Sequence, residues 1–135
     1  MNIVVDTNCL LVALLVKSPY YWLWQAFRNK KITLCYTTDI LQEYHEVLAR
    51  SYPLTFVNDI VSELLHSENV KQVTNFYRWN LITTDLDDNK FVDCALNAGA
   101  EYIVTNDRHF NILKNIPFPK IEIINIITFK QIIDV

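Results

Sequence analysis

The chain has 135 residues, of which 51% are hydrophobic and 20% charged, and its formal net charge at pH 7 is −3. These values predict one soluble globular domain over residues 1–135 and exclude a disordered or collagen-like chain. The single glycine, Gly99, excludes Gly-rich phosphate loops and dinucleotide-binding turns. The acidic balance argues against nucleic-acid binding through bulk positive charge, but not against binding through metal ions.

The first half of the chain alternates short β-branched runs with helical patterns. Residues 3–5 resemble a buried strand, and Thr7 can cap the helix that follows. Ser18 and Pro19 can open a second helix, because proline is favoured at a first helical position. The expected elements are a strand at 3–5, helices at 7–17 and 20–29, a strand at 32–36, a helix capped by residues 37–39 and, after Pro53, a helix around residues 57–65.

The second half continues this alternation. Residues 70–87 are the least regular and allow a short strand before a loop, after which Asp87 and Asp88 can cap a helix that ends at Gly99. The remaining expected elements are strands at 102–105 and 121–124, a short helix between them and a helix at 128–133. Strands alternating with helices predict an α/β fold with a mainly parallel sheet.

The cysteines and the apolar segments indicate a cytoplasmic protein. Cys9, Cys35 and Cys94 form no CxxC pair, which predicts reduced thiols in the core. No apolar run is long enough to span a membrane, and the run after Asp6 lacks the basic segment of a signal peptide. We therefore expect no membrane partner.

Two acidic residues follow expected strands, and two lie on expected helices. Because parallel strands end at one edge of a sheet, Asp6 and Asp107 should lie at the edge where ligands bind. Each is explained equally well as a helix N-cap. Asp88 falls near the middle of the apolar arc of its helix, and Glu43 borders the apolar stripe of another. Taken alone, Asp88 is also explained as an N-cap and Glu43 as a solvated side chain.

Four carboxylates at one site favour metal-dependent chemistry. Without a cation they would repel one another and their pKa values would rise. Mg²⁺ and Mn²⁺ prefer oxygen ligands, and one or two such ions would suit hydrolysis of a phosphodiester by a metal-bound water. Lys90 and Arg108 flank two of the acids and could contact substrate phosphates, although each is also explained as an ordinary solvated charge.

Three passages of the sequence resemble the PIN-domain family of small metal-dependent nucleases, and in particular its VapC-type toxins. They are residues 3–8 (IVVDTN), residues 41–50 (LQEYHEVLAR) and residues 87–108. The resemblance implies a PIN-like domain whose parallel sheet is sandwiched by helices. It also implies that Asp6, Glu43, Asp88 and Asp107 are catalytic residues that bind Mg²⁺ or Mn²⁺.

The same resemblance implies accessory residues around these acids. They are Thr7, Asn8, Asp93, Thr105 and Asn106. Thr7 and Asn8 would orient Asp6 by hydrogen bonds. Thr105 or Asn106 would orient Asp107 in the same way. Asp93 matches a position that is often acidic in this branch. Helix geometry, however, places Asp93 with Asn89 and Asn97 on the polar side of its helix, opposite the apolar arc.

The function implied is a metal-dependent endoribonuclease that acts as the toxin of a type II toxin–antitoxin pair. Its partners would be an RNA substrate and a protein antitoxin, and homodimers are common in the family. The alternative is a PIN-fold binding module without efficient chemistry, motivated by the acidic pI and by Asn89, which replaces an acid common in this branch. A phospho-accepting receiver domain would need an acidic pair at the first strand, where only Asp6 stands.

Overall fold

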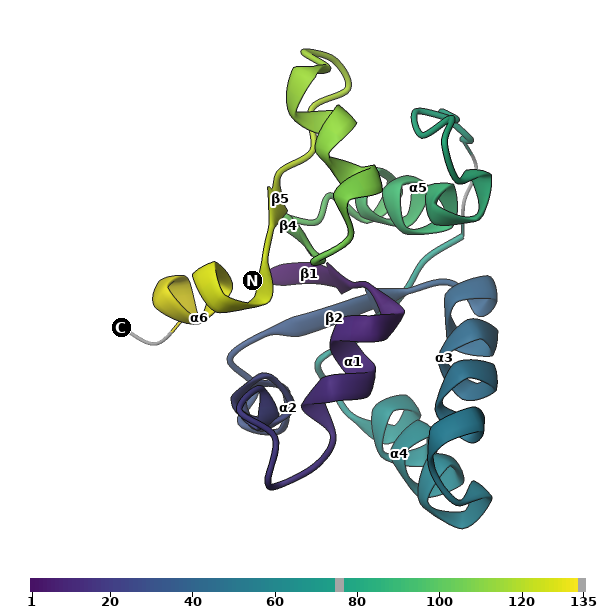
Figure 1. Cartoon of the computed structure of the whole chain (residues 1–135), viewed down its shortest axis with the longest axis vertical. Coiled ribbons are helices and arrows are strands. Elements are labelled where there is room, and N and C mark those ends of the chain that lie inside the picture. Colours follow the sequence, from purple (N-terminus) through teal and green to yellow (C-terminus); the bar gives the residue numbers. More distant parts are fainter. Residues whose placement is uncertain (75–76, 134–135) are drawn as a thin grey trace.

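Five parallel strands form the central sheet, in the order β3-β2-β1-β4-β5 (Figure 1). The computed structural model describes residues 1–74 and 77–133. Within them the strands are β1 (Asn2–Val5), β2 (Thr33–Tyr36), β3 (Val70–Gln72), β4 (Tyr102–Val104) and β5 (Ile123–Ile124). In β1 the apolar residues Ile3, Val4 and Val5 are all buried, because this strand lies in the middle of the sheet.

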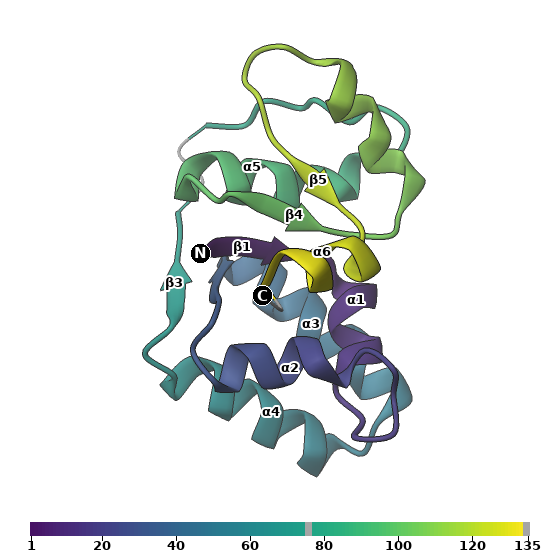
Figure 2. The ribbon, with the colours of Figure 1, turned by 90° about the vertical axis from the view of Figure 1, so that its left-hand side faces the viewer.

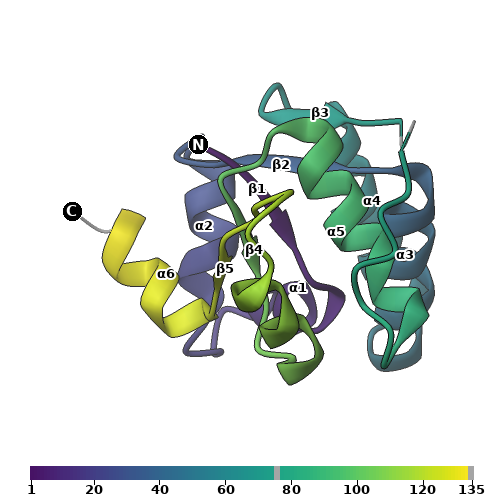
Figure 3. The same ribbon diagram turned by 90° about the horizontal axis from the view of Figure 1, so that it is seen from above.

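Helices cover both faces of the sheet. They are α1 (Thr7–Ala13), α2 (Tyr21–Arg28), α3 (Thr38–Ser51), α4 (Leu54–His66), α5 (Asn89–Ala98) and α6 (Ile126–Ile133), with short 3-10 helices η1 (Leu86–Asp88) and η2 (Arg108–Asn115). Figure 2 shows α5 above β1 and β4, and α2 and α4 below the sheet. At one side of the molecule α6 lies beside α2 (Figure 3), and the rings of Trp22 and Phe129 are 6.3 Å apart. The predicted α/β fold, a parallel sheet between helical layers, is confirmed.

Local capping explains where several helices begin and end. The Thr37 side chain accepts a hydrogen bond from the backbone N–H of Ile40 at 3.2 Å and so caps α3, as predicted. The expected helix at 7–17 is shorter and ends at Ala13. Residues 15–17 are exposed, so a longer helix would bury no further apolar side chain there. The hydroxyl of Ser18 closes a turn instead, accepting from the N–H of Tyr20 at 3.1 Å, and α2 begins at Tyr21.

The cysteines are buried and free, as the predicted reduced thiols would be. Within residues 1–74 and 77–133, no helix has the length and apolar content needed to cross a membrane.

Gly99 ends α5 in the left-handed conformation, with φ of 65° and ψ of 36°. A Cβ at this position would meet no atom within 4 Å, so the cost of a side chain comes from the backbone alone. We expect Gly99→Ala to lower the free energy of unfolding by about 1–2 kcal/mol. Urea denaturation measures this change, with the exposed Glu101→Ala as a control that should shift stability by less than about 0.5 kcal/mol. Equal midpoints for Gly99→Ala and wild type would contradict the prediction.

Candidate active site

Asp6 and Asp107 lie at the carboxyl ends of neighbouring strands. Asp6 directly follows β1, and Asp107 comes shortly after β4, which pairs with β1. The first half of the chain builds the sheet from β1 towards β3, and the second half builds it from β4 towards β5. Ligand sites of parallel sheets lie where the strand order reverses in this way. The two acids therefore lie where the sequence predicted.

Thr105 connects these two strand ends. Its hydroxyl donates to Oδ2 of Asp6 at 2.7 Å and accepts a hydrogen bond from the backbone N–H of Asp107 at 3.0 Å. The sequence assigned this residue to Asp107 alone. The structure shows that it also fixes the carboxylate of Asp6, which is only 6% exposed.

Tyr44 and Thr7 hold Glu43 beside this edge of the sheet. Tyr44 is buried in α3, and its hydroxyl donates to the backbone carbonyl of Val5, the last residue of β1. This hydrogen bond fixes α3 against the strand end and brings the adjacent Glu43 close to Asp6. The hydroxyl of Thr7 donates to Oε2 of Glu43, and the backbone N–H of Thr7 donates to the carboxylate of Asp6, the residue to which the sequence assigned Thr7.

Asp88 lies at the end of η1 with one carboxylate oxygen left unpaired. Oδ2 is buried and has no hydrogen-bond partner among the described residues, although Nδ1 of His109 lies 3.4 Å away. Burial and the negative charges of Asp85, Asp107 and Asp6 raise the pKa of Asp88 to about 6. The group is thus held in a place that disfavours its own ionised form.

The N-cap explanation fails for two of the acids. Asp6 and Asp88 both occupy N-cap positions, yet the side chain of neither accepts a capping hydrogen bond. Asp107 does cap its helix, with Oδ1 accepting from the N–H of His109 at 2.9 Å. Near Asp88, the cap of η1 is provided by Asp85. Because Asp6 and Asp88 do not cap a helix, their carboxylate oxygens can bind another partner.

The four predicted acids form one negatively charged group. Burial raises the pKa of Asp6, and the charges of Asp107 and Glu43 raise it further, while the Thr105 hydroxyl opposes the shift. Asp88 in turn is affected by the charges of Asp6 and Asp107. Acidic side chains that are as much as a hundred residues apart in the chain therefore act on one another at one edge of the sheet.

This donor set fits a hard divalent cation. Carboxylate oxygens are the preferred ligands of Mg²⁺ and Mn²⁺, and the buried Oδ2 of Asp88 lacks a partner that such an ion would supply. In addition, ligand atoms of Asp85, Asp88 and His109 all lie within 4.8 Å of one another. Asp85 was not among the acids predicted from the sequence, and the three histidines show no paired-ligand spacing in the chain, so a zinc site was not expected and the proximity of His109 to these acids was missed.

Of the two basic residues expected near the site, Lys90 pairs with acids. Its ammonium lies 2.7 Å from Oε1 of Glu43 and 3.0 Å from Oδ1 of Asp87, so it neutralises part of the local charge. Arg108 is exposed next to Asp107.

Two accessory residues show no side-chain hydrogen bond to the acids' carboxylates within the described parts of the chain. Asn8 is exposed. The Asn106 side chain accepts from the N–H of Ile126 at 3.2 Å, so it fixes the start of α6 rather than the orientation of Asp107.

The polar face of α5 is covered by the preceding segment. Asn89 and Asp93 are 6% and 4% exposed. Asn89 bonds both the N–H and the carbonyl of Ile82 at 2.9 Å, and Asp93 accepts from the N–H of Trp79 at 3.0 Å. Asn89 and Asp93 thus hold residues 77–82 against α5 through hydrogen bonds to the backbone. The amphipathic pattern of the helix does not reveal this role.

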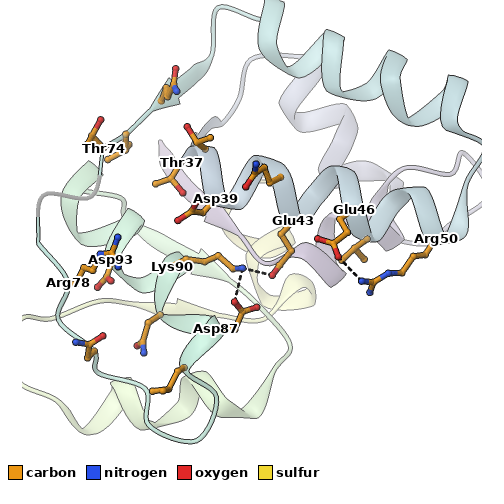
Figure 4. Close-up of a pocket in the computed structure, with 18 residues that line it drawn as sticks. Thr37, Asp39, Glu43, Glu46, Arg50, Thr74, Arg78, Asp87, Lys90 and Asp93 are labelled. Carbon is orange, nitrogen blue, oxygen red and sulfur yellow. Dashed lines mark hydrogen bonds and ion pairs between the residues drawn. The ribbon is translucent and has the colours of Figure 1, made fainter.

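A cavity of about 760 Å³ lies between α3 and α5 and reaches Glu43 (Figure 4). Lys90 bridges it from α5, and the Glu46–Arg50 pair lies farther along α3. Its charged lining residues are Asp39, Glu43, Glu46, Arg50, Arg78, Asp87, Lys90 and Asp93. Five acids against three bases leave this groove acidic beside the carboxylate group.

Residues 2–109 match the PIN domain family, and the chain belongs to that family. No curated protein matches the chain in sequence. Among solved structures it is similar to VapBC2 from Rickettsia felis bound to a DNA fragment from their promoter, with a TM-score of 0.64 and 18% identity over 93% of this chain and 98% of the other.

Two further structures share the fold. FitAB bound to the IR36 DNA fragment has a TM-score of 0.58 and 12% identity over 92% of this chain and 94% of the other. The PIN domain endonuclease Utp24 has a TM-score of 0.52 and 16% identity over 92% of this chain and 84% of the other.

Proposed function

We propose that this PIN-domain protein is a metal-dependent endoribonuclease and the toxin of a type II toxin–antitoxin pair. The observation that supports the proposal is that the charges of Glu43 and Asp107 act on Asp6, and those of Asp6 and Asp107 act on Asp88, at the edge of the sheet where Oδ2 of Asp88 is buried. Similarity to an endonuclease and to VapBC2 and FitAB supports the same reading.

In this proposal the four acids would hold one or two Mg²⁺ or Mn²⁺ ions. When bound, the ion supplies an activated water and neutralises charge on the scissile phosphate. Thr105 holds the carboxylate of Asp6 and Thr7 holds that of Glu43, so both side chains are oriented by hydrogen bonds. Lys90, which pairs with Glu43 and Asp87 in the absence of substrate, and the exposed Arg108 would contact phosphates of the strand.

The alternative function, a binding module without catalytic activity, is supported by one observation fewer. It drew on Asn89 standing in place of an acid, but the Asn89 amide pairs with both backbone groups of Ile82, which gives this residue a structural role. A protein antitoxin as partner, a homodimer and a cytoplasmic location remain part of the proposal on the strength of the family resemblance.

Cleavage of a labelled single-stranded RNA tests the nuclease. We expect cleavage with Mg²⁺ or Mn²⁺, none with EDTA, and a loss of at least about 100-fold in Asp6→Asn, because even residues that only support a metal ligand typically contribute 10- to 100-fold. The matched control is Asp59→Asn, an exposed position on α4. Equal rates in wild type and Asp6→Asn, or cleavage that persists in EDTA, would refute the metal mechanism.

Induced expression in bacteria tests the toxin role. Wild-type chain should arrest growth and Asp6→Asn should not, with immunoblots to show equal amounts of both proteins. Growth arrest by both variants would contradict a toxicity that depends on nuclease activity.

A further inference from the structure

His109 lies among three carboxylates at the start of η2. Its Nδ1 is 3.4 Å from Oδ2 of Asp88, 3.4 Å from Oδ1 of Asp107 and 3.9 Å from Oδ2 of Asp85. The backbone N–H of His109 donates to Asp107, which fixes this residue at the edge of the acidic group. An imidazole nitrogen that faces several carboxylate oxygens is a typical arrangement of a mixed metal site.

Three of these groups already have the spacing of ligands around one ion. Ligand atoms of Asp85, Asp88 and His109 lie within 4.8 Å of one another. Two ligands that each lie about 2.0–2.2 Å from a metal are at most about 4.4 Å apart, so small side-chain movements suffice. The side chains of His109 and Asp85 are 47% and 45% exposed, which leaves them room to move.

Asp88 contributes an oxygen that faces His109. Its Oδ2 atom is buried, lies 3.4 Å from Nδ1 of His109 and has no other hydrogen-bond partner among the described residues. Within the described parts of the chain, no Lys or Arg comes within 4.0 Å of a carboxylate oxygen of Asp85, Asp88 or Asp107. Lys90, the base that lies nearby in sequence, is taken up by Glu43 and Asp87.

We propose that His109 and Asp85 are metal ligands that join Asp88 in a mixed nitrogen–oxygen site, so that the protein binds a divalent transition metal in preference to Mg²⁺. The proposal rests on the metal-dependent function above and deepens it by naming the class of ion. Carboxylates alone suit Mg²⁺ and Mn²⁺ alike, whereas an imidazole ligand favours transition metals over Mg²⁺. The nitrogen of His109 therefore provides the selectivity.

Pulsed EPR of the full chain loaded with Mn²⁺ tests for the nitrogen ligand directly. We expect a ¹⁴N coupling to Mn²⁺ in wild type and in His66→Gln, a control at an exposed histidine near the end of α4, and no such coupling in His109→Gln. A wild-type Mn²⁺ complex without ¹⁴N coupling would overturn the proposal, and this measurement needs no variant.

Calorimetric titration with Mn²⁺ and with Mg²⁺ tests the selectivity. His109→Gln and Asp85→Asn should each weaken Mn²⁺ binding by at least about 10-fold, and His109→Gln should change Mg²⁺ binding by less than about 3-fold. Thermal unfolding in EDTA shows whether each variant is folded. If wild type and folded His109→Gln bind Mn²⁺ equally well, this inference fails while the nuclease proposal stands. If wild type binds neither ion at millimolar concentration, both fail.

Discussion

The Asp88→Asn protein is expected to lose RNA cleavage by at least about 100-fold and yet, in EDTA near pH 7.5, to unfold at a higher temperature than wild type. Both effects have one cause. The carboxylate of Asp88 is held where burial and the charges of Asp85, Asp107 and Asp6 disfavour its ionised form. A bound cation would compensate this penalty, and an amide would remove it together with the metal ligand.

The stability effect has a predictable pH dependence. The pKa of Asp88 is about 6 in the folded chain, against the ordinary aspartate value of 3.8. Between these values the folded state keeps a proton that the unfolded state has released, so the contribution of this group to stability falls as pH rises from about 4 to 6. Above that window the whole penalty is present. The gain in melting temperature from Asp88→Asn should therefore be large near pH 7.5 and vanish near pH 4, as measured by circular dichroism in EDTA.

The neighbouring Asp87 is the matched control, because its shift has the opposite sign. The hydrogen bond from Lys90 lowers the pKa of Asp87, so its ionised form stabilises the folded chain above the unfolded pKa. Asp87→Asn should lower the melting temperature slightly near pH 7.5, since the side chain is 72% exposed. If Asp88→Asn melted below wild type in EDTA, or still cleaved RNA at the wild-type rate, the interpretation of this site would be wrong.

Asn89→Asp is expected to destabilise the protein without improving its nuclease activity. An aspartate can still accept the hydrogen bond from the N–H of Ile82, but it cannot donate to the carbonyl, and a buried charge replaces an amide. Leaving one buried partner unpaired costs about 1–3 kcal/mol, and the charge adds to this, so we expect a loss of at least about 2 kcal/mol. Urea denaturation measures it at neutral pH.

Asn111→Asp provides the comparison for this variant, because Asn111 is exposed on η2 and the change should alter stability by no more than about 0.5 kcal/mol. RNA cleavage by Asn89→Asp separates the two roles of the position. A gain in activity or metal affinity would mean that the asparagine weakens a metal site rather than docking residues 77–82.

Prediction from the sequence was most reliable where local patterns and chain order determine the structure. The β-branched run before Asp6, the cap at Thr37 and the single glycine after α5 each follow from short-range stereochemistry, and all three match. The expected positions of Asp6 and Asp107 at one sheet edge followed from parallel strands alone. The same local reasoning extended the first helix too far, because it could not show that residues 15–17 lack a surface to pack against.

Contacts between distant parts of the chain were beyond such reasoning. The partner of Thr7 is Glu43, and that of Asn89 is the backbone of Ile82. The helical wheel of α5 placed Asn89 and Asp93 on the polar side of the helix and did not show that they are buried, because it contains no information about a segment that folds over that face. Likewise, nothing near Asp88 in sequence indicates that an imidazole lies 3.4 Å from its oxygen.

The sequence by itself therefore determined the alternation of strands and helices, the parallel sheet and the set of acids worth examining, because these depend on residue type and spacing along the chain. Only the tertiary structure decided which acids remain uncapped, which hydroxyl holds which carboxylate, and where His109 lies. These features depend on distances between residues far apart in the chain, and packing of α5 on β1 and β4, of α3 on α5 and of η2 on β5 sets those distances.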